Sequence, residues 1–396
     1  MADALAKAKA SPLLSLLALG NFVVGMGVFV VVGIMSPIAE GLAVSKSDAS
    51  LVLTSYAIAY ALLSPIGAAL TGSLPRRTVL AAALGLFCVG SLLSAISTSL
   101  LTLTASRLLV AFGAALYTPL SAGVAVAVTS TENRGWALAK VFGGMTMAQV
   151  AGVPLGAWLA YRFGWQAPFF LSAALAAICT LVLIKAIPPS LQFPAGNVRA
   201  TFRALGDFRL MVSVTFTATL MAAIYIVFTY FAPLIEMSAG SNPEARTLYL
   251  VLFGLGAMCG NYVGGYLSDR IGPLRTLMMV CAAHIVLLPL FSIMPWHPLI
   301  LALLVVVWSS VAWSFMPPQQ SRLAAIAPSG VALALALNAA MIYAGIAVGS
   351  TIAAMVLSRF GLEGLGISAG VMAAAAVAHL VWSERVARPR APTNKT

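Results

Sequence analysis

The sequence predicts an all-α polytopic membrane protein in which twelve transmembrane helices form two pseudo-symmetric six-helix bundles. Three observations lead to this fold class: the composition, a series of twelve long apolar segments, and motifs that recur at half the chain length. Of the 396 residues, 61% are hydrophobic and 8% are charged, whereas soluble proteins carry about 25% charged residues. A soluble fold of this size has too little interior to bury so much apolar surface, so the lipid bilayer is its expected surroundings.

Twelve apolar segments are long enough to cross a bilayer, which takes about 20 residues of helix. Most breaks between them carry charges or turn residues, as at 73–77 and 295–298. The first segment follows Lys7 and Lys9, as in a signal peptide, but it runs on without a convincing cleavage site and is predicted to stay as a helix. The segments are 13–38, 49–71, 78–98, 101–128, 135–160, 167–187, 210–235, 246–268, 274–294, 298–318, 329–357 and 364–383.

The longest polar stretch divides the chain into two halves. It begins at Pro188-Pro189, carries three arginines and lies between the sixth and seventh apolar segments. We therefore predict an N-terminal six-helix bundle over 1–187, a cytoplasmic linker over 188–209 and a C-terminal six-helix bundle over 210–396.

Basic residues set the predicted orientation, because Lys and Arg accumulate on the cytoplasmic side of membrane proteins. With both termini cytoplasmic, 17 of the 22 Lys and Arg residues lie on inner loops and tails, and only Lys46, Arg162, Arg246 and Arg359 lie outside. This bias predicts a multi-pass protein of a bacterial inner (plasma) membrane. It also explains the net charge of +12 without any nucleic-acid partner.

The two halves repeat short motifs at one spacing. The Arg-Phe-Gly sequence at 162–164 recurs 197 positions later at 359–361, and Gly152 matches Gly349 at the same offset. Pro37 and Glu40 match Pro233 and Glu236 at an offset of 196. Matches near half the chain length predict parallel repeats around a central site, which is the architecture of alternating-access carriers.

The loop after the eighth segment reads Gly-Tyr-Leu-Ser-Asp-Arg-Ile-Gly at 265–272. It resembles the signature of the major facilitator superfamily of transporters. The resemblance implies that its acid docks on a helix N-terminus near 133–135, where the helix dipole favours a carboxylate, and that its first glycine allows a close backbone approach. The alternative is a solvated Asp-Arg turn. The first-half loop keeps only the two arginines, so we expect an asymmetric cytoplasmic gate. The gating residues are Gly265, Asp269, Arg270 and Gly272, with Arg76 and Arg77.

The fourth segment contains Leu-Thr-Ala-Ser-Arg at 103–107, followed by Gly-Ala-Ala at 113–115. It resembles the superfamily's second motif, whose arginine is linked to substrate and proton handling. Arg107 is the only Lys or Arg well inside a predicted span, and an intramembrane arginine is costly unless it faces a cavity or a partner. Because Arg107 lies about two turns in, snorkelling to the outer interface is the alternative.

The fifth segment contains Gly143-Gly144 and then Gly-Val-Pro-Leu-Gly at 152–156. This sequence resembles the motif of proton-coupled exporters, and it makes Gly152, Pro154 and Gly156 further gating candidates. With Gly-Trp-Gln at 164–166, the chain looks like drug and sugar exporters of the arabinose-efflux-permease type, a drug:proton antiporter branch. The resemblance covers nearly the whole chain.

Acids are missing from the predicted membrane interior, because all ten fall in loops, tails or helix ends. Val28 and Ala114 stand where relatives of this branch often have an acid and a histidine. Asp48 or Glu236 at the outer mouth is the acid expected to assist Arg107. The sequence contains no catalytic set, no metal-ligand spacing and no phosphate-binding loop, so we expect neither an enzyme nor a cofactor or metal site.

Cavities in this architecture are lined by the first, second, fourth and fifth helices of each half. The polar and aromatic residues of these spans are the candidate substrate residues, and a packing role is equally open for each. With Arg107 they describe an aromatic pocket with a few amide and hydroxyl groups and one cation. They are Asn21, Tyr56, Tyr60, Tyr117, Gln149, Tyr225, Tyr230, Asn261, Trp308, Trp313, Asn338 and Tyr343.

We expect a secondary active transporter that exports a small amphiphilic molecule, such as a drug, sugar or metabolite, in exchange for protons. The lack of a midplane carboxylate favours a neutral, zwitterionic or anionic cargo over a polycation. An uptake carrier or an uncoupled facilitator of the same fold is the alternative, and a non-transporting receptor is a more distant one. The protein is expected to act as a monomer.

Overall fold

The structure is a computed structural model that describes residues 2–71, 74–129, 134–187, 206–240, 242–328 and 331–387. Across these residues the chain is almost entirely helical. They include ten helices long and apolar enough to cross a membrane. The other two predicted segments, 49–71 and 135–160, are helical as well. Most of the predicted linker lies outside the described residues, so the division of the chain at 187 and 210 stays a prediction.

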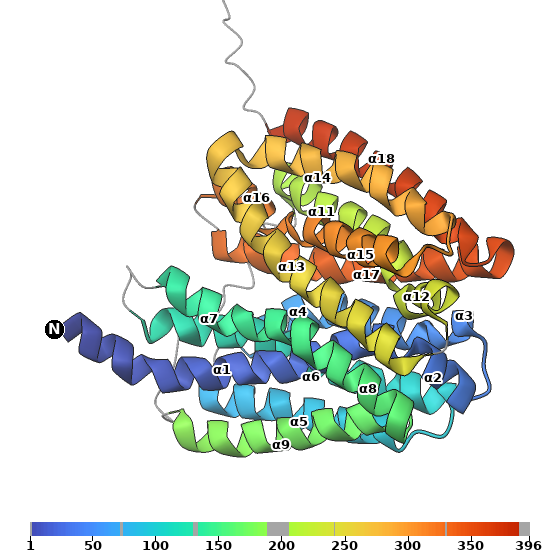
Figure 1. Ribbon diagram of the computed structural model, residues 1–396. Helices are drawn as coiled ribbons and strands as arrows, with labels where there is room; N and C mark the ends of the chain where they lie inside the picture. The colour runs from blue at the N-terminus through green and yellow to red at the C-terminus, as the bar shows by residue number, and fades with distance from the viewer. Residues whose placement is uncertain are drawn as a thin grey trace, which may run out of the picture.

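The N-terminal half packs as one group of helices, shown in blue to green in Figure 1. In it, α5 lies between α6 and α9, while α1 packs against α7. Its helices are α1 (Ala2–Gly33), α2 (Met35–Gly41), α3 (Lys46–Ala49), α4 (Leu51–Leu70), α5 (Arg76–Ala95), α6 (Leu100–Ala127), α7 (Arg134–Met147), the π-helix η2 (Ala148–Gly152), α8 (Val153–Phe163) and α9 (Ala167–Ala186).

The C-terminal half forms the second group, yellow to red in Figure 1. Here α11 packs against both α17 and α18, and α13 packs against α15. Its helices are α11 (Phe208–Phe228), α12 (Phe231–Ala239), α13 (Pro243–Ile271), α14 (Pro273–Leu287), the 3₁₀-helix η3 (Leu288–Ser292), α15 (Pro298–Trp313), α16 (Met316–Ile326), α17 (Val331–Phe360) and α18 (Glu363–Ala387).

The first helix of each half breaks at the same repeat position. The residue before α2 is Ile34 and the residue before α12 is Tyr230, which are 196 positions apart. Pro37 and Pro233 follow three residues later in each half. A proline has no N–H to donate and is tolerated in the first turn of a helix, so each long apolar segment restarts there. The internal repeat is therefore visible in the backbone.

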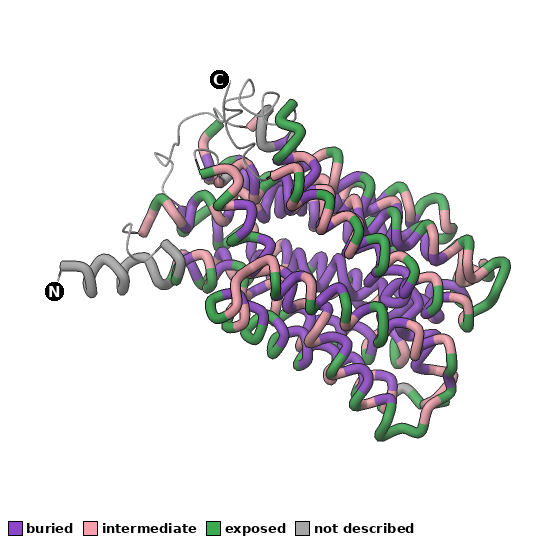
Figure 2. Tube along the Cα trace, turned by 90° about the horizontal axis from the view of Figure 1, so that it is seen from above, coloured by how far each residue is buried: buried purple, intermediate pink, exposed green. Residues whose placement is uncertain are grey.

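Apolar side chains cover the outside of both halves. Figure 2 shows buried residues where helices face one another and exposed residues along the outer surface. Large apolar residues there are widely exposed, among them Leu101, Leu181, Val286 and Val371, at 64–79%. Soluble monomers rarely expose contiguous apolar surface of this extent. This surface fits the hydrocarbon of a bilayer.

Candidate functional site

The two halves are joined at the end of the molecule that carries the predicted outer loops. Figure 1 places α2, α3 and α12 together at this end. The hydroxyl groups of Thr54 (α4) and Ser350 (α17) lie 2.7 Å apart and are buried. The Ser47 hydroxyl donates to the carbonyl oxygen of Ala354 at 3.2 Å. Side chains from helices of both halves thus close this end.

A carboxylate from the C-terminal half holds charged and polar groups from both halves. Glu236 of α12 pairs with Lys46 of α3 at 3.3 Å and with Arg246 of α13 at 2.8 Å. It also accepts a hydrogen bond from the Tyr161 hydroxyl of α8 at 3.4 Å. The Arg246 guanidinium lies 4.1 Å from the centre of the Tyr161 ring. We call Lys46, Tyr161, Glu236 and Arg246 the outer cluster.

A second ion pair crosses between the halves nearby, but it is open to solvent. Arg162 and Glu244 lie 3.1 Å apart, with side chains 57% and 62% exposed. Solvent-exposed pairs of this kind contribute little because water screens them. Of the four basic residues predicted to lie outside, Lys46 and Arg162 therefore form ion pairs between the halves, and Arg246 forms one within the C-terminal half.

Three tyrosines meet across the halves in the middle of the molecule. Tyr60 of α4 stacks on Tyr343 of α17 with ring centres 3.6 Å apart. Tyr56, one turn earlier on α4, lies 6.2 Å from Tyr60 and 6.1 Å from Tyr343. All three are buried. The spacing of Tyr56 and Tyr60 on one helix face was visible in the sequence, whereas the partner from the other half was not. We call these three residues the tyrosine cluster.

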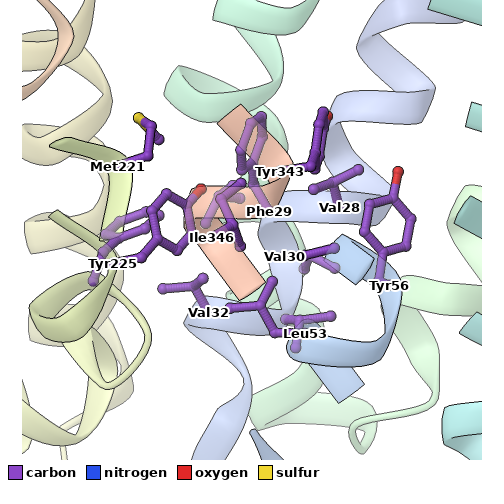
Figure 3. Packing of buried hydrophobic residues seen from close by; sticks show 14 of the residues in the cluster. Val28, Phe29, Val30, Val32, Leu53, Tyr56, Met221, Tyr225, Tyr343 and Ile346 are labelled. Atoms are coloured by element: carbon purple, nitrogen blue, oxygen red, sulfur yellow. The ribbon is translucent and has the colours of Figure 1, made fainter. Parts of the chain in front are cut away.

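Apolar side chains of both halves surround the tyrosine cluster. Figure 3 shows part of this buried surface, and the residues that it labels come from α1, α4, α11 and α17. Across it, Trp313 of α15 meets Phe29 of α1 edge to face, with ring centres 6.3 Å apart. Tyr225 of α11 is buried beside Phe228, at 5.3 Å. The labelled residues are Val28, Phe29, Val30, Val32, Leu53, Tyr56, Met221, Tyr225, Tyr343 and Ile346.

Arg107 is fully buried behind the tyrosine cluster. Its exposed fraction is 0%, so the side chain does not snorkel to the outer surface. One guanidinium nitrogen, Nη2, donates to the carbonyl oxygen of Gly27 at 2.6 Å. The guanidinium carbon lies 5.0 Å from the ring centre of Tyr56 and 5.5 Å from that of Phe169. Nε and Nη1 have no hydrogen-bond partner among the described residues.

Helix α13 marks where the two halves separate. Its residues Leu250 and Gly254 face Gly33 and Val150 of the N-terminal half. Asn261 continues the same helix face seven residues further, and it is exposed. The contact between the halves along this helix therefore ends about two turns after Gly254, toward the predicted cytoplasmic end.

The predicted gating loop lies beyond this point. Asp269 is exposed, and it makes no hydrogen bond or ion pair with any residue that the structure describes. Its predicted docking position near 133–135 falls largely outside the described residues. Arg270 lies over the ring of Tyr266, 5.3 Å from its centre. Gly272 ends α13 with φ of 89°, a conformation that favours glycine.

Other gating candidates have contacts within their own half. A β-carbon at Gly265 would have the Pro317 side chain nearest to it, at 3.8 Å, whereas one at the neighbouring Gly264 would meet the Ser314 backbone. The close backbone approach at Gly265 stays a prediction. Arg76 is buried and donates to the Thr71 carbonyl oxygen at 3.2 Å. Arg77 is half-buried.

The fifth-segment motif lies between α1 and α13. The chain forms a π-helix at Ala148–Gly152, directly before Pro154, which has no N–H to donate to the preceding turn. Gly152 and Gly156 face Met26 and Val30 of α1. The sequence did not predict the π-helix, although such turns occur often at functional sites. The buried Gln149 lies inside it.

Several candidate substrate residues serve packing within one half. The Asn21 amide donates to Ser121 at 2.9 Å, and the Tyr117 hydroxyl donates to the Leu17 carbonyl oxygen at 3.2 Å. Asn338 accepts a hydrogen bond from Thr217. Trp308 lies among four phenylalanines of the C-terminal half. Tyr230 is buried at the break before α12. The structure therefore brings together the tyrosine cluster, Arg107 and the Trp313–Phe29 pair. The other candidates named in this paragraph lie apart from them.

The burial of Arg322 was missed by the sequence reasoning, which placed it in a cytoplasmic loop. Arg322 is 5% exposed. It donates to Ser383 at 2.6 Å and to Gln319 at 3.5 Å, and it pairs with Glu384 at 3.6 Å. Unlike Arg107, it has a carboxylate partner. The proximity of α16 and α18 at this point had no signal in the sequence.

Two helical halves that meet around a buried aromatic and cationic centre, with apolar surfaces outside, define a multi-pass membrane transporter. The chain matches the Major Facilitator Superfamily over residues 17–332, and it belongs to this superfamily. The predicted family and fold class are thus confirmed.

Similar proteins support this assignment. The chain is 28% identical to the Uncharacterized MFS-type transporter YbcL of Bacillus subtilis over 93% of this chain and 95% of that protein. It is 29% identical to the Inner membrane transport protein YdhP of Escherichia coli K12, over 90% of each. These bacterial relatives fit a place in the inner membrane.

Solved structures of the same fold include a bacterial homolog of the human lysosomal transporter Spinster in an inward-facing, unoccupied conformation. Its TM-score is 0.76 at 18% identity, covering 97% of this chain and 99% of that one. The nucleoside transporter NupG also has a TM-score of 0.76, at 14% identity, covering 93% and 98%. At these identities the likeness shows the fold alone.

Proposed function

We propose that this transporter exports a small amphiphilic molecule by alternating access in exchange for protons, and that the structure is its inward-facing state. One observation carries the proposal: the halves are joined at the predicted outer end and separate toward the predicted inner end. At the outer end, the halves are joined by the contact of Thr54 with Ser350 and by the outer cluster. Toward the inner end, Asn261 and Asp269 are exposed.

The cargo site in this proposal is the tyrosine cluster with Arg107. Tyr60 and Tyr343 come from opposite halves, so a molecule placed between them is exposed to one side or the other as the halves tilt. An aromatic surface with few polar groups is typical of sites for amphiphilic ligands. In the outward-facing state we propose that Asp269 docks at the start of α7 and that Arg270, Gly265 and Gly272 complete the gate with Arg76 and Arg77.

The direction of transport rests on the resemblance of residues 152–156 to the exporter motif. The contacts of residues 148–156 with α1 and α13 support a role in gating, in which a change in the π-helix shifts the halves relative to each other. We propose that Gly152, Pro154 and Gly156 act in this way. We also propose a monomer in the bacterial inner membrane with both termini cytoplasmic, supported by the distribution of basic residues.

Proton coupling in this proposal uses Arg107, assisted by Glu236 or Asp48 at the outer end. An uncoupled facilitator is the second candidate, and a specific observation favours it: no carboxylate forms an ion pair with Arg107 among the described residues.

Two experiments test the proposal. Labelled compounds should accumulate less in cells that express the protein than in cells that lack the gene, and Arg107→Gln should abolish the difference. In reconstituted vesicles, an imposed pH gradient should drive transport. Equal rates with and without the gradient would identify the facilitator, and higher accumulation in expressing cells would identify an uptake carrier.

A further inference from the structure

We infer that the cargo is an organic anion, a carboxylate on an apolar body, and that Arg107 and Tyr56 bind its charged group. This inference rests on the proposed transport function and narrows it. It follows from the distribution of charges in the membrane-spanning part and from the hydrogen-bond donors around Arg107.

The charge of Arg107 has no counterpart in the described structure. The side chain is 0% exposed, and none of the four ion pairs of the described residues includes it. Cation–π contacts with Tyr56 and Phe169 compensate part of the lost hydration. A buried cation without a counter-charge remains unfavourable, so an anion that enters the site gains the full attraction of the guanidinium.

Apart from Nη2, which donates to Gly27, the buried donors at Arg107 have no acceptor in the described structure. Nε and Nη1 of Arg107 and the hydroxyl group of Tyr56 are buried, and none has a hydrogen-bond partner among the described residues. A guanidinium can only donate. Leaving such groups unpaired is unfavourable, and a ligand that supplies acceptors removes this penalty. A carboxylate offers acceptors and the matching charge, whereas an ammonium group offers neither.

The surroundings fit an apolar body attached to this head group. The rings of Tyr56 and Phe169 lie 5.0 Å and 5.5 Å from the guanidinium carbon. Tyr60 lies one helical turn, about 6 Å, from Tyr56 toward the predicted cytoplasmic end, and it stacks on Tyr343. When these two rings separate, their faces offer a flat apolar surface that leads to Arg107. The site therefore favours an aromatic or aliphatic carboxylate over a small inorganic anion.

Two other buried arginines, Arg322 and Arg246, differ from Arg107 in this respect. Arg322 pairs with Glu384 and donates to Ser383, and Arg246 pairs with Glu236. Because each of these has a carboxylate from the protein itself, neither calls for an anionic ligand. Arg107 alone combines complete burial with unpartnered guanidinium nitrogens and no ion pair within the described part of the chain.

The test uses the purified full-length protein in lipid nanodiscs and three probes of one shape: 2-naphthylacetate, its primary amide and 2-naphthylethylammonium. Binding is followed by the shift of the unfolding temperature and by equilibrium dialysis. We expect the carboxylate to bind at least about tenfold more tightly than the amide, because the amide cannot form one or two of the charge-assisted hydrogen bonds. The ammonium compound should not bind.

Variants assign the effect to the site. Arg107→Gln should abolish the preference for carboxylate over amide, Tyr56→Phe should weaken carboxylate binding, and Arg162→Gln, in the exposed pair, should leave both unchanged. Arg107→Gln should also unfold at a temperature no lower than that of the wild type without ligand, because it removes an uncompensated charge. If a variant does not fold, the comparison of the three probes on the wild type still tests whether the site prefers a carboxylate.

Any of the following results would overturn the inference: equal binding of carboxylate and amide, preference for the ammonium probe, or equal protection by chloride or phosphate. The absence of saturable carboxylate binding would do the same. Export of neutral compounds by cells would then still support the proposed function. If no compound of any charge is transported, the proposed function itself fails.

Discussion

Replacement of Glu236 by Gln should open the predicted outer end of the transporter. Glu236 is the acceptor that joins Lys46 and Tyr161 of the N-terminal half to the C-terminal half. Its pair with Arg246 lies within one half and is kept in both conformations, so it does not bias the equilibrium. Only the contacts with Lys46 and Tyr161 are lost when the halves move apart.

The size of the effect follows from these two contacts. The Lys46 side chain is 37% exposed and that of Glu236 is 21% exposed, so solvent screening holds the ion pair to below about 1 kcal/mol. The Tyr161 hydrogen bond, at 3.4 Å, adds about 1 kcal/mol. Together they stabilise the closed outer end by about 1–2 kcal/mol, which is a factor of about 5–30 in the ratio of closed to open molecules.

Spin labels at two exposed outer positions measure this ratio. Cysteines introduced at Glu40 and Ser358, which are exposed and come from different halves, can be labelled and their distance distribution recorded by double electron–electron resonance. Glu236→Gln should add a population at longer distance. Arg162→Gln is the matched control, since its pair with Glu244 is exposed, and it should change little. Identical distributions for the wild type and Glu236→Gln would refute the role of the outer cluster.

Three further predictions concern the interface and the packing of the C-terminal half. Thr54→Cys with Ser350→Cys should form a disulfide that stops transport, and reduction should restore it, because the native hydroxyl groups lie 2.7 Å apart; undiminished transport by the cross-linked protein would contradict this. Gly260→Ala should lower the free energy of unfolding by about 1–3 kcal/mol in a thermal unfolding assay, because its Cβ meets the Ser310 backbone of α15. Gly85→Ala, with open space around it, should not lower it. Arg322→Gln should destabilise the protein by about 1–3 kcal/mol, because it removes the buried ion pair with Glu384 and the hydrogen bond to Ser383; an unchanged unfolding temperature would argue against that network.

The sequence predicts the helices well because an uninterrupted apolar segment of about 20 residues has few other solutions in a bilayer. It does not predict where these helices break. The changes at Ile34 and Tyr230 fall inside apolar segments, and their signal is the proline three residues later. The only sequence signal for the π-helix at Ala148–Gly152 is likewise a proline that follows it, Pro154.

The site was predictable only within one helix at a time. The spacing of Tyr56 and Tyr60 on one turn of α4 places them on a common face, but Tyr343 joins them through packing between the halves. Charge bias gives the side on which Lys46 and Arg246 lie, and it does not give their common partner. Asn21 and Tyr117 have the composition of a binding site, yet their hydrogen bonds within one half are equally natural for polar residues in a membrane helix.

Coupled export through the site at Arg107 is tested most directly by one measurement. Reconstituted vesicles containing the wild type or Arg107→Gln are loaded with a labelled amphiphile, and its movement is followed with and without an imposed pH gradient. We expect transport against the concentration gradient of the amphiphile only when the wild type is present and the pH gradient is applied. Equal transport by Arg107→Gln, or wild-type rates that do not respond to the gradient, would contradict it.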